Sequence, residues 1–354
     1  MDRIQIKSKF FDYTVEFVDS ADGILPAAHG ECVYVLDSNV YTLYKTYFEH
    51  AGTERVFLVD AVESEKNIYT VIDLVDFLRK AGFKKSWKLI AVGGGITQDI
   101  CSFTSAVYLR NIDWVFFPTT LLSMSDSCIG GKCGINHGEY KNQLGVFYPP
   151  KRVYIYEAFL NTLSADDWIN GWGEILKMSL IDGPDFYNEL TSLGCYIPCA
   201  EIGKYIHWSL LAKKRIIEED EFEGGLRRIL NYGHTFGHAL ESYTNNKIPH
   251  GKAVIWGMDV ENYIAVAEGL IDRQIYLAIK SLIKEHFLTS EIQIGEPSAL
   301  FPIIGTDKKV LGSCVHLALP TNPGKLIVYP MEIGRRLEAL FEEYLIETHE
   351  YYGG

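Results

Sequence analysis

The chain has 354 residues, a formal net charge of −13 and 47% hydrophobic residues. This composition is that of a globular protein, and a chain of this length usually forms more than one hydrophobic core. The acidic balance argues against a nucleic-acid or anionic-membrane partner, because the long-range field would repel both. It leaves a phosphorylated small molecule open, since a few converging Lys and Arg side chains can bind one phosphate. Seven scattered cysteines, no signal-peptide pattern and no run of 18 apolar residues lead us to expect a cytoplasmic protein with reduced thiols.

In the first part of the chain, short β-rich apolar runs alternate with amphipathic segments. The runs are residues 32–37, 55–60, 88–95 and 114–120, and the segments between them, 66–80 and 97–110, have helical spacing. This alternation predicts a parallel sheet covered by helices. Residues 134–156, punctuated by Asn, Gly and Pro-Pro, predict a hairpin or extended connector.

After residue 157 the pattern becomes mostly helical. Helices are expected at 166–181, 202–218, 227–243, 253–269, 273–285 and 331–348, with one strand-like piece at 313–320. We therefore predict an α/β, Rossmann-like domain over residues 1–156 and a mostly α-helical domain over residues 157–354.

A run of three glycines, 93–95, ends a buried apolar run and precedes a predicted helix. Glycine lets the backbone approach a pyrophosphate, and a helix N-terminus offers free N–H groups to anionic oxygens. Asp99 and the Pro118-Thr119-Thr120 turn add polar groups at strand ends, where ligands of open α/β sheets bind. Together these features predict a nucleotide site.

The segment LRRILNYGHTFGHALE places Arg227, Asn231, His234 and His238 at spacings of four, three and four. In one helix these residues would share a face. Two histidines on such a face, with His250 opening the next helix and one carboxylate, suit a catalytic zinc site with open positions. Glu174, with Lys177 three residues on, could supply the carboxylate. Spacing alone leaves His238 in competition for a ligand place.

The segment 126–142 places Asp126, Lys132, Lys141 and Asn142 around glycine turns. Ammonium and amide donors on such a loop can surround a phosphate. We therefore expect an anion-binding loop here.

These motifs resemble those of 3-dehydroquinate synthase and its sugar-phosphate cyclase relatives over nearly the whole chain. The matching segments are ESEK (63–66), GGGITQD (93–99), YLR (108–110), PTTLLSMSDSCIGGKCGINHGEYKN (118–142), GEILK (173–177), GGLRRILNYGHTFGHALE (224–241), HG (250–251) and DKK (307–309). The chain departs from the usual family pattern at Gln98, where Gly is common, at Lys252, where Glu is common, and near the start of the 166–181 helix.

The resemblance implies roles for individual residues. Glu174, His234 and His250 would bind zinc, or cobalt or another divalent metal, which frees His238 for the substrate. The implied NAD residues are Asp37, Asn39, Glu63, Lys66, Gly94, Gly95, Ile96, Asp99, Thr119, Thr120, Asp126 and Lys141. The implied substrate residues are Asp126, Lys132, Lys141, Asn142, Lys177, Lys213, Arg227, Asn231, His238 and Lys308, with Arg110 lent across a homodimer interface to the substrate phosphate.

The implied activity is cyclisation of 3-deoxy-D-arabino-heptulosonate 7-phosphate to 3-dehydroquinate and phosphate, with NAD oxidised and reduced within one turnover. Retention of Arg227 favours a carboxylate-bearing substrate, which a guanidinium binds through two parallel hydrogen bonds. Three alternatives stay open: a cyclase acting on sedoheptulose 7-phosphate or another sugar phosphate, an NAD- and metal-dependent polyol dehydrogenase, and a non-catalytic binding subunit.

Overall fold

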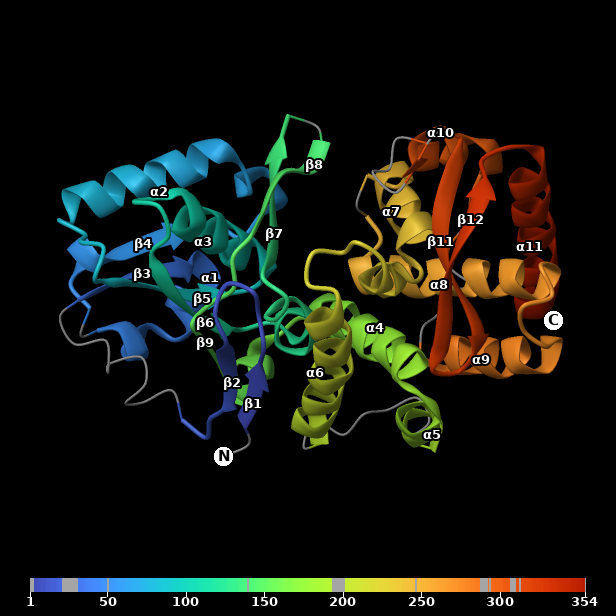
Figure 1. Cartoon of the computed structure of the whole chain (residues 1–354), viewed down its shortest axis with the longest axis horizontal. Coiled ribbons are helices and arrows are strands. Elements are labelled where there is room, and N and C mark those ends of the chain that lie inside the picture. Colours follow the sequence, from blue (N-terminus) through green and yellow to red (C-terminus); the bar gives the residue numbers. More distant parts are fainter. Residues whose placement is uncertain are drawn as a thin grey trace. The chain divides into compact units, whose positions relative to one another are not determined.

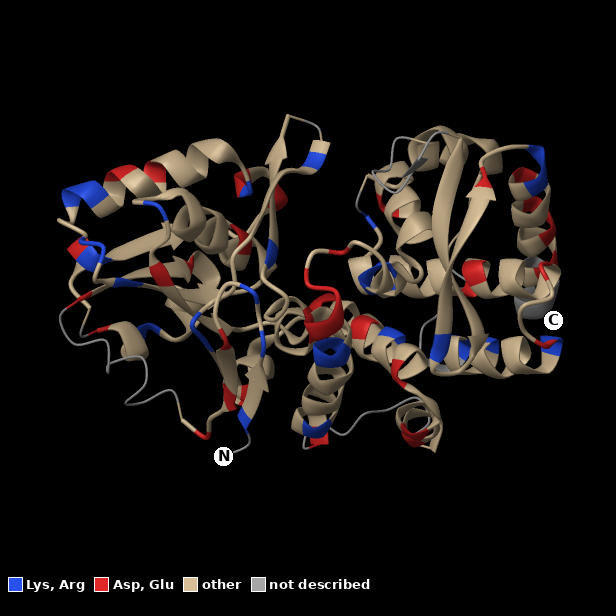
Figure 2. Ribbon diagram, in the orientation of Figure 1, with Lys and Arg blue, Asp and Glu red and all other residues tan. Residues whose placement is uncertain are grey.

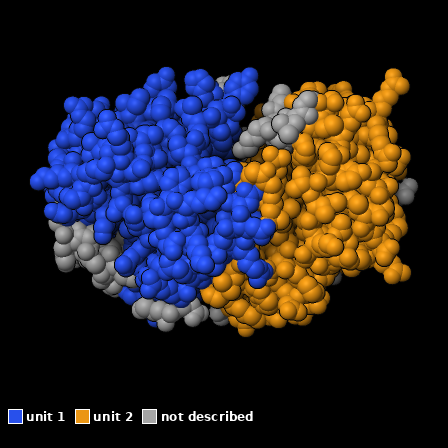
Figure 3. Space-filling model, viewed as in Figure 1, with its two compact units in different colours: residues 1–164, 213–222 blue, residues 165–212, 223–354 orange. Residues whose placement is uncertain are grey.

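The computed structural model describes residues 3–20, 31–49, 51–138, 140–192, 201–245, 247–286, 292, 294–305, 310–311 and 313–353. The chain forms two compact units (Figure 3): unit 1 contains residues 1–164 and 213–222, and unit 2 contains residues 165–212 and 223–354. Lys308, assigned to the substrate by resemblance, lies outside the described residues.

Unit 1 is built on a seven-stranded sheet (Figure 1). Its strands, in spatial order, are β1 (Arg3–Ile6), β2 (Tyr13–Phe17), β9 (Arg152–Ile155), β6 (Asp113–Pro118), β5 (Lys88–Gly93), β3 (Cys32–Asp37) and β4 (Val56–Val59). All neighbours pair in parallel except β1, which is antiparallel to β2. The predicted parallel sheet is confirmed; β1 and β2 were not predicted from the sequence.

Helices and a hairpin complete unit 1. They are α1 (Ser38–Leu43), α2 (Ile68–Lys80), α3 (Gly95–Val107), the hairpin β7 (Lys132–His137) and β8 (Tyr140–Phe147), the π-helical turn η4 (Ser123–Ser127), and the short 3-10 helices η1 (Lys45–Phe48), η2 (Thr53–Arg55), η3 (Glu63–Glu65) and η5 (Glu157–Thr162). The predicted helix 97–110 stops at Val107, and Leu109, Arg110 and Asn111 then adopt left-handed backbone angles. The predicted hairpin within 134–156 is confirmed.

The order of the strands creates a switch point between β3 and β5. The chain leaves β3 for β4 on one side and leaves β5 for β6 on the other. In open α/β sheets ligands bind at the carboxyl ends of the strands flanking such a point. Here those ends are Asp37 and Gly93.

Two segments that the sequence analysis placed in the second domain belong to unit 1. Residues 157–164 pack there through Phe159, whose ring lies edge-on to Tyr44 at 4.9 Å between centroids. Residues 213–222 are held by side-chain contacts: Glu221 accepts hydrogen bonds from the Ser8 hydroxyl (2.5 Å) and the Lys9 amide (2.7 Å). Local hydrophobic periodicity cannot predict such contacts, because they join residues that are far apart in the sequence.

Unit 2 combines helices with a three-stranded antiparallel sheet, β10-β11-β12 (Figure 1). Its elements are α4 (Ala165–Asp182), α5 (Pro184–Ser192), α6 (Ile202–Glu219, whose last residues belong to unit 1), η7 (Leu226–Asn231), α7 (His234–Tyr243), α8 (His250–Ala267), α9 (Arg273–His286), η9 (Pro297–Ala299), α10 (Leu300–Gly305), β10 (Val310–Leu311), β11 (Cys314–Asn322), β12 (Lys325–Glu332) and α11 (Arg335–Gly353). A core around Phe236, Trp256 and Phe341 joins α7, α8 and α11.

Two sequence expectations for this unit are wrong. The predicted helix 227–243 is divided into η7 and α7 by Gly233, whose φ is +77°. The predicted helix 331–348 begins only at Arg335, because Met331 pairs with Val315 at the end of β12. The strand β12 was missed, although the Asn322-Pro323-Gly324 turn, with Gly324 at φ +82°, is a turn signal between the two strands.

Charged residues are distributed over both units. Figure 2 shows Lys and Arg interspersed with Asp and Glu along the helices, with acidic residues frequent on α11. No helix in the described part of the chain combines the length and apolar character needed to cross a bilayer.

Candidate active site

Three side chains of unit 2 converge on one point from three helices. The Glu174 Oε1 atom, on α4, lies 3.4 Å from His234 Nε2 at the start of α7 and 3.3 Å from His250 Nε2 at the start of α8. Glu174 is 1% exposed. Burial opposes its ionisation, but the Lys177 ammonium beside it and His234 hold the pKa of the Glu174 carboxyl well below its usual range. The cluster therefore presents a buried carboxylate to two imidazoles.

The second nitrogen of each imidazole has a hydrogen-bond partner that fixes the tautomer. His234 Nδ1 lies 3.0 Å from the Tyr232 carbonyl oxygen, which can only accept, so Nδ1 carries the proton. His250 Nδ1 lies 3.3 Å from Glu241 Oε2 in the same way. When the rings are neutral, their Nε2 lone pairs are directed to the shared point, and a carboxylate behind a histidine is a common support for a metal ligand.

The pKa values of the two imidazoles are shifted in opposite directions. Burial and the nearby Lys177 ammonium lower the pKa of His234, which keeps this ring neutral and able to coordinate. Burial also acts to lower the pKa of His250, but hydrogen bonds to Glu174 and Glu241 outweigh it and raise the value to about 10. A raised pKa is expected for the His250 imidazole, because it lies between the carboxylates of Glu174 and Glu241.

The donor geometry fits a tetrahedral divalent ion. Donor atoms about 2.0–2.1 Å from zinc in a tetrahedral site lie about 3.3–3.4 Å from one another, and the two Glu174–histidine distances have these values. Both Glu174 oxygens are buried: Oε2 pairs with the Lys177 ammonium, and Oε1 faces the two imidazoles, so a cation among these donors would compensate a carboxylate shielded from water. These residues could therefore hold zinc or a similar metal.

A second combination of donors shares His250. Donor atoms of His238, Glu241 and His250 also lie within 4.8 Å of one another. In that group Glu241 and His250 Nδ1 already satisfy each other, whereas the Nε2 atoms of His234 and His250 both face Glu174 Oε1. The Glu174, His234 and His250 group is therefore the better metal site, and His238 stays beside it, its ring centroid 5.2 Å from that of His234.

Each of the three donors has a glycine neighbour in the sequence at which helix backbones touch. A Cβ atom on Gly173 would lie 2.7 Å from the Gly251 carbonyl oxygen, and one on Gly251 would lie 2.4 Å from the Ile169 carbonyl oxygen. A Cβ atom on Gly233 would lie 2.3 Å from the Val254 carbonyl oxygen. Contacts this short exclude any side chain, so glycine is required for α4, α7 and α8 to bring the donors together.

Buried residues of α8 hold the turn that precedes His234. The Gly233 amide donates to Glu261 Oε2 (2.9 Å), and the Tyr232 hydroxyl donates to Asn262 Oδ1 (2.5 Å). Tyr232, Glu261 and Asn262 are 0% exposed. This turn carries the Tyr232 carbonyl that orients His234, so α8 supports both histidine donors.

The other expected residues of unit 2 lie near these elements but not on one helical face. Arg227 and Asn231 belong to η7, while His234 and His238 belong to α7, so the shared face predicted for all four is wrong. Arg227 is 4% exposed, and Asn231 donates from Nδ2 to Glu223 Oε1 at 2.8 Å.

In unit 1 the glycine turn and its neighbours meet at the sheet's switch point. Asp37 ends β3 and accepts the Asn39 amide at 2.8 Å as the N-cap of α1. A Cβ atom on Gly94 would lie 3.0 Å from Thr120 Cγ2, so the glycine turn touches the end of the neighbouring strand. One on Gly95 would meet nothing within 4 Å. Open backbone at a helix start is suited to a pyrophosphate.

A buried ammonium connects α3 to the hairpin. Lys66 Nζ lies 2.8 Å from Asn142 Oδ1, 3.2 Å from Asp99 Oδ2 and 3.4 Å from Glu63 Oε1. Burial raises the pKa of Asp99 to about 6 although Lys66 acts to lower it. The structure thus brings the neighbouring residues Glu63 and Lys66 together with Asp99 and Asn142 from distant parts of the sequence.

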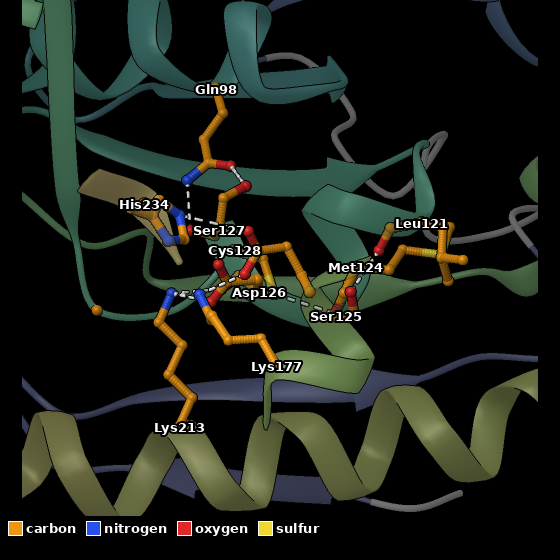
Figure 4. Close-up of polar contacts among 12 residues, drawn as sticks. Gln98, Leu121, Met124, Ser125, Asp126, Ser127, Cys128, Lys177, Lys213 and His234 are labelled. Atoms are coloured by element: carbon orange, nitrogen blue, oxygen red, sulfur yellow. Dashed lines mark hydrogen bonds and ion pairs between the residues drawn. The ribbon is translucent and has the colours of Figure 1, made fainter. Parts of the chain in front are cut away.

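Asp126 and Lys213 form a second pair in unit 1 (Figure 4). Lys213 Nζ lies 2.6 Å from Asp126 Oδ1 and donates to the Asp126 carbonyl oxygen at 2.8 Å. Lys132 and Lys141, on the hairpin, are exposed. Arg110 is exposed in the left-handed turn 109–111, where Lys85 Nζ donates to the carbonyl oxygens of Leu109 (3.1 Å) and Arg110 (2.9 Å).

Sequence reasoning missed the residues that support the donors. Glu241 lies seven residues after His234, in the quoted motif, and its position facing His250 depends on the turn between α7 and α8. Glu261 and Asn262 gave one signal, polar residues inside an otherwise apolar helix, which indicates buried hydrogen bonds.

Comparisons with known proteins agree with this architecture. Residues 56–170 match the family model described as 3-dehydroquinate synthase N-terminal, and residues 171–310 match the one described as 3-dehydroquinate synthase C-terminal. The 3-dehydroquinate synthase of Streptococcus pyogenes serotype M3 is 33% identical over 332 residues, which cover 91% of this chain and 93% of that protein.

Two solved structures share the fold. A 2-deoxy-scyllo-inosose synthase, complexed with carbaglucose-6-phosphate, NAD+ and Co2+, superposes with a TM-score of 0.85 at 23% identity, covering 98% of this chain and 99% of that one. The 2-epi-5-epi-valiolone synthase of Streptomyces hygroscopicus, with NAD+ and Zn2+ bound, has a TM-score of 0.82 at 25% identity, covering 98% and 99%.

The fold is therefore that of the dehydroquinate synthase-like cyclases, with a Rossmann-like N-terminal unit and a mainly helical C-terminal unit. Within this class, the two family-model matches together cover most of the chain. The chain belongs to the 3-dehydroquinate synthase family.

Proposed function

We propose that this protein is a 3-dehydroquinate synthase, which converts 3-deoxy-D-arabino-heptulosonate 7-phosphate to 3-dehydroquinate and inorganic phosphate. The observation that carries the proposal is the Glu174–His234–His250 cluster in a chain of this family, with donor distances that match a tetrahedral metal site. In the overall reaction a C–O bond to phosphate breaks and a C–C bond closes the ring. It needs no net oxidant, so it is a phosphate-eliminating lyase reaction.

In this proposal unit 1 binds NAD. The pyrophosphate would lie against Gly94, Gly95 and Ile96 at the start of α3, where the backbone is open and the helix N–H groups are available. The remaining contacts would come from residues at the strand ends and the hairpin: Asp37, Asn39, Glu63, Lys66, Asp99, Thr119, Thr120, Asp126 and Lys141. NAD, when bound, supplies a hydride acceptor that returns the hydride later in the turnover.

Unit 2 would hold the divalent ion through Glu174, His234 and His250. An ion at these donors supplies Lewis acidity to a substrate hydroxyl. Lys177, 2% exposed and paired with Glu174, would donate to an oxygen near the ion. In water-poor surroundings such a preorganised cation stabilises developing oxyanion charge strongly.

The phosphate and carboxylate of the substrate would be bound by different residues. Lys132, Asn142, Asn231 and His238, with Arg110 from a second copy of the chain, would hold the phosphate. Arg227 and Lys213 are the proposed carboxylate contacts, because a guanidinium can bind a carboxylate through two parallel hydrogen bonds and an ammonium can pair with it. Asp126 would accept a hydrogen bond from a ring hydroxyl. We propose that the protein is a homodimer, because Arg110 would reach the phosphate bound by the second copy. We also propose that it is cytoplasmic, as expected from its scattered cysteines.

The decisive experiment incubates the purified protein with NAD+, zinc and each candidate sugar phosphate, and identifies the carbocyclic product by NMR. Formation of 3-dehydroquinate with equimolar phosphate supports the proposal. Turnover of sedoheptulose 7-phosphate or a glucose phosphate instead would assign the chain to another cyclase of the superfamily. Net accumulation of NADH would indicate a polyol dehydrogenase, because a cyclase regenerates NAD+ in each turnover.

A further inference from the structure

We propose that Gln98 is a positioning residue for Asp126: it fixes the Asp126–Ser127 turn through two side-chain hydrogen bonds, so that the Asp126 carboxylate faces the substrate. The inference rests on the proposed function, since Asp126 is one of the substrate contacts assigned there. Gln98 lies on α3, four residues after Gly94, and its own amide donates to the Gly94 carbonyl oxygen at 3.0 Å.

The Gln98 side chain uses both ends of its amide on one residue (Figure 4). Its Nε2 atom donates to the Ser127 carbonyl oxygen at 2.6 Å, and its Oε1 atom accepts from the Ser127 hydroxyl at 2.6 Å. Gln98 is 4% exposed, so these bonds are shielded from water. A two-point contact restrains both the position and the rotation of the turn.

The turn is held at neighbouring peptides from two sides. Lys213 donates to the Asp126 carbonyl oxygen, and Gln98 donates to the next carbonyl along the chain. Lys213 also pairs with the Asp126 carboxylate at 2.6 Å. A lysine ammonium ends a flexible four-carbon stem and cannot by itself set the direction of Asp126. Gln98 extends from the regular helix α3, and its side-chain amide therefore fixes the position of the Asp126–Ser127 turn.

The local backbone makes this restraint necessary. Residues Ser123–Ser127 form a π-helical turn, with the Cys128 amide donating to the Ser123 carbonyl oxygen at 3.1 Å. An inserted residue of this kind is less stable than regular helix and is common at functional sites. Further contacts secure its start, where the hydroxyls of Thr120 and Ser123 lie 2.8 Å apart. Gln98 secures its end.

The test compares Gln98→Met, which keeps the length of the side chain but removes both bonds, with Ser102→Ala. Ser102 lies one turn further along α3, is 2% exposed, and donates from its hydroxyl to the Tyr148 carbonyl oxygen at 2.9 Å. The control therefore removes a buried hydrogen bond of the same helix without affecting the Asp126–Ser127 turn. Both variants are assayed as the full chain with NAD+ and zinc.

We expect Gln98→Met to lower kcat/KM for the sugar phosphate about ten- to hundredfold, because a small misplacement of a substrate contact has effects of this size. Affinity for NAD+ should change no more than in Ser102→Ala, and amide hydrogen exchange of residues 124–129 should accelerate only in Gln98→Met. Ser127→Ala should add little to Gln98→Met, because the two side chains act on each other.

Equal kcat/KM in Gln98→Met and Ser102→Ala, or unchanged exchange at 124–129, would overturn the proposal. If Gln98→Met does not fold, Gln98→Asn serves instead, since the shorter amide cannot reach Ser127 and should show the same losses. If the wild-type protein turns over no sugar phosphate, the proposed function fails, while the exchange comparison still decides whether Gln98 holds the turn.

Discussion

Replacing Glu241 by alanine tests the support behind the metal centre. The change removes the acceptor of the His250 Nδ1–H group, 3.3 Å away, and leaves the metal-facing nitrogen less basic and the ring less firmly oriented. Loss of such a partner typically weakens metal binding about 10- to 100-fold, or about 1.4–2.7 kcal/mol. Because the His250 side chain is 29% exposed and water can replace part of the lost bond, we expect the lower end of this range.

The assay is competition for zinc against a chromophoric chelator, with thermal unfolding of the metal-free protein measured in parallel. Glu241→Gln keeps a neutral acceptor, so its loss should be smaller, about fivefold. Glu268→Ala is a matched control: its carboxylate is 12% exposed against 13% for Glu241, and it accepts hydrogen bonds from Tyr329 and Arg336. It lies at the opposite end of α8, about 27 Å from His250. Zinc affinity within about twofold of wild type in Glu241→Ala, or an equal loss in Glu268→Ala, would refute the reasoning.

Three further predictions follow from other features. Gly251→Ala should weaken zinc binding at least as much as Glu241→Ala, because its Cβ atom would lie 2.4 Å from the Ile169 carbonyl oxygen. The control Gly305→Ala, which has open space around the new Cβ atom, should bind zinc normally. Equal zinc affinities of these two glycine variants in the chelator assay would contradict this prediction. Arg227→Ala should raise KM for the carboxylate substrate far more than the Kd for NAD+, and equal losses would count against its assignment. Burial raises the pKa of Asp99 to about 6, against an ordinary 3.8. Between these two pH values the folded protein therefore binds more protons than the unfolded chain. The free energy of unfolding should then fall as the pH rises through this window, by about 3 kcal/mol at most. Urea titrations at pH 4 to 7 should show this fall in the wild type and lose it in Asp99→Asn, and an unchanged slope in the variant would refute the assignment.

Local sequence signals were enough for the elements whose periodicity is regular. The four apolar runs of residues 32–120 form parallel strands, because short β-branched segments alternating with helices have few other solutions. The strands β1 and β2 were missed because their neighbours in the sheet are remote in sequence: β2 pairs with β9, more than a hundred residues later. The pairing of a strand with a partner far away in the sequence depends on the tertiary fold, so it cannot be predicted from the residues around that strand.

The candidate site was predictable as a set of residue types more than as a geometry. Uniform helical spacing across 227–243 suggested one continuous face, but Gly233 takes a left-handed angle and its amide bonds to Glu261, which ends one helix and starts another. The choice of Glu174 as the carboxylate came from family resemblance, since many carboxylates fit the spacing equally well. Distances of 3.3 and 3.4 Å to the imidazoles supply the geometric reason.

The glycine contacts beside Glu174, His234 and His250 have a consequence for how the protein acquires its ion. Spacing among the donors is determined by touching main chains, which cannot spread or rotate as side chains can. The metal-free protein should therefore already hold the donors at coordinating distance, and ion capture needs little reordering of the chain. Nearly all of the intrinsic coordination energy would then appear as stabilisation of the folded state against unfolding, which grows with the logarithm of the free ion concentration once this exceeds the Kd.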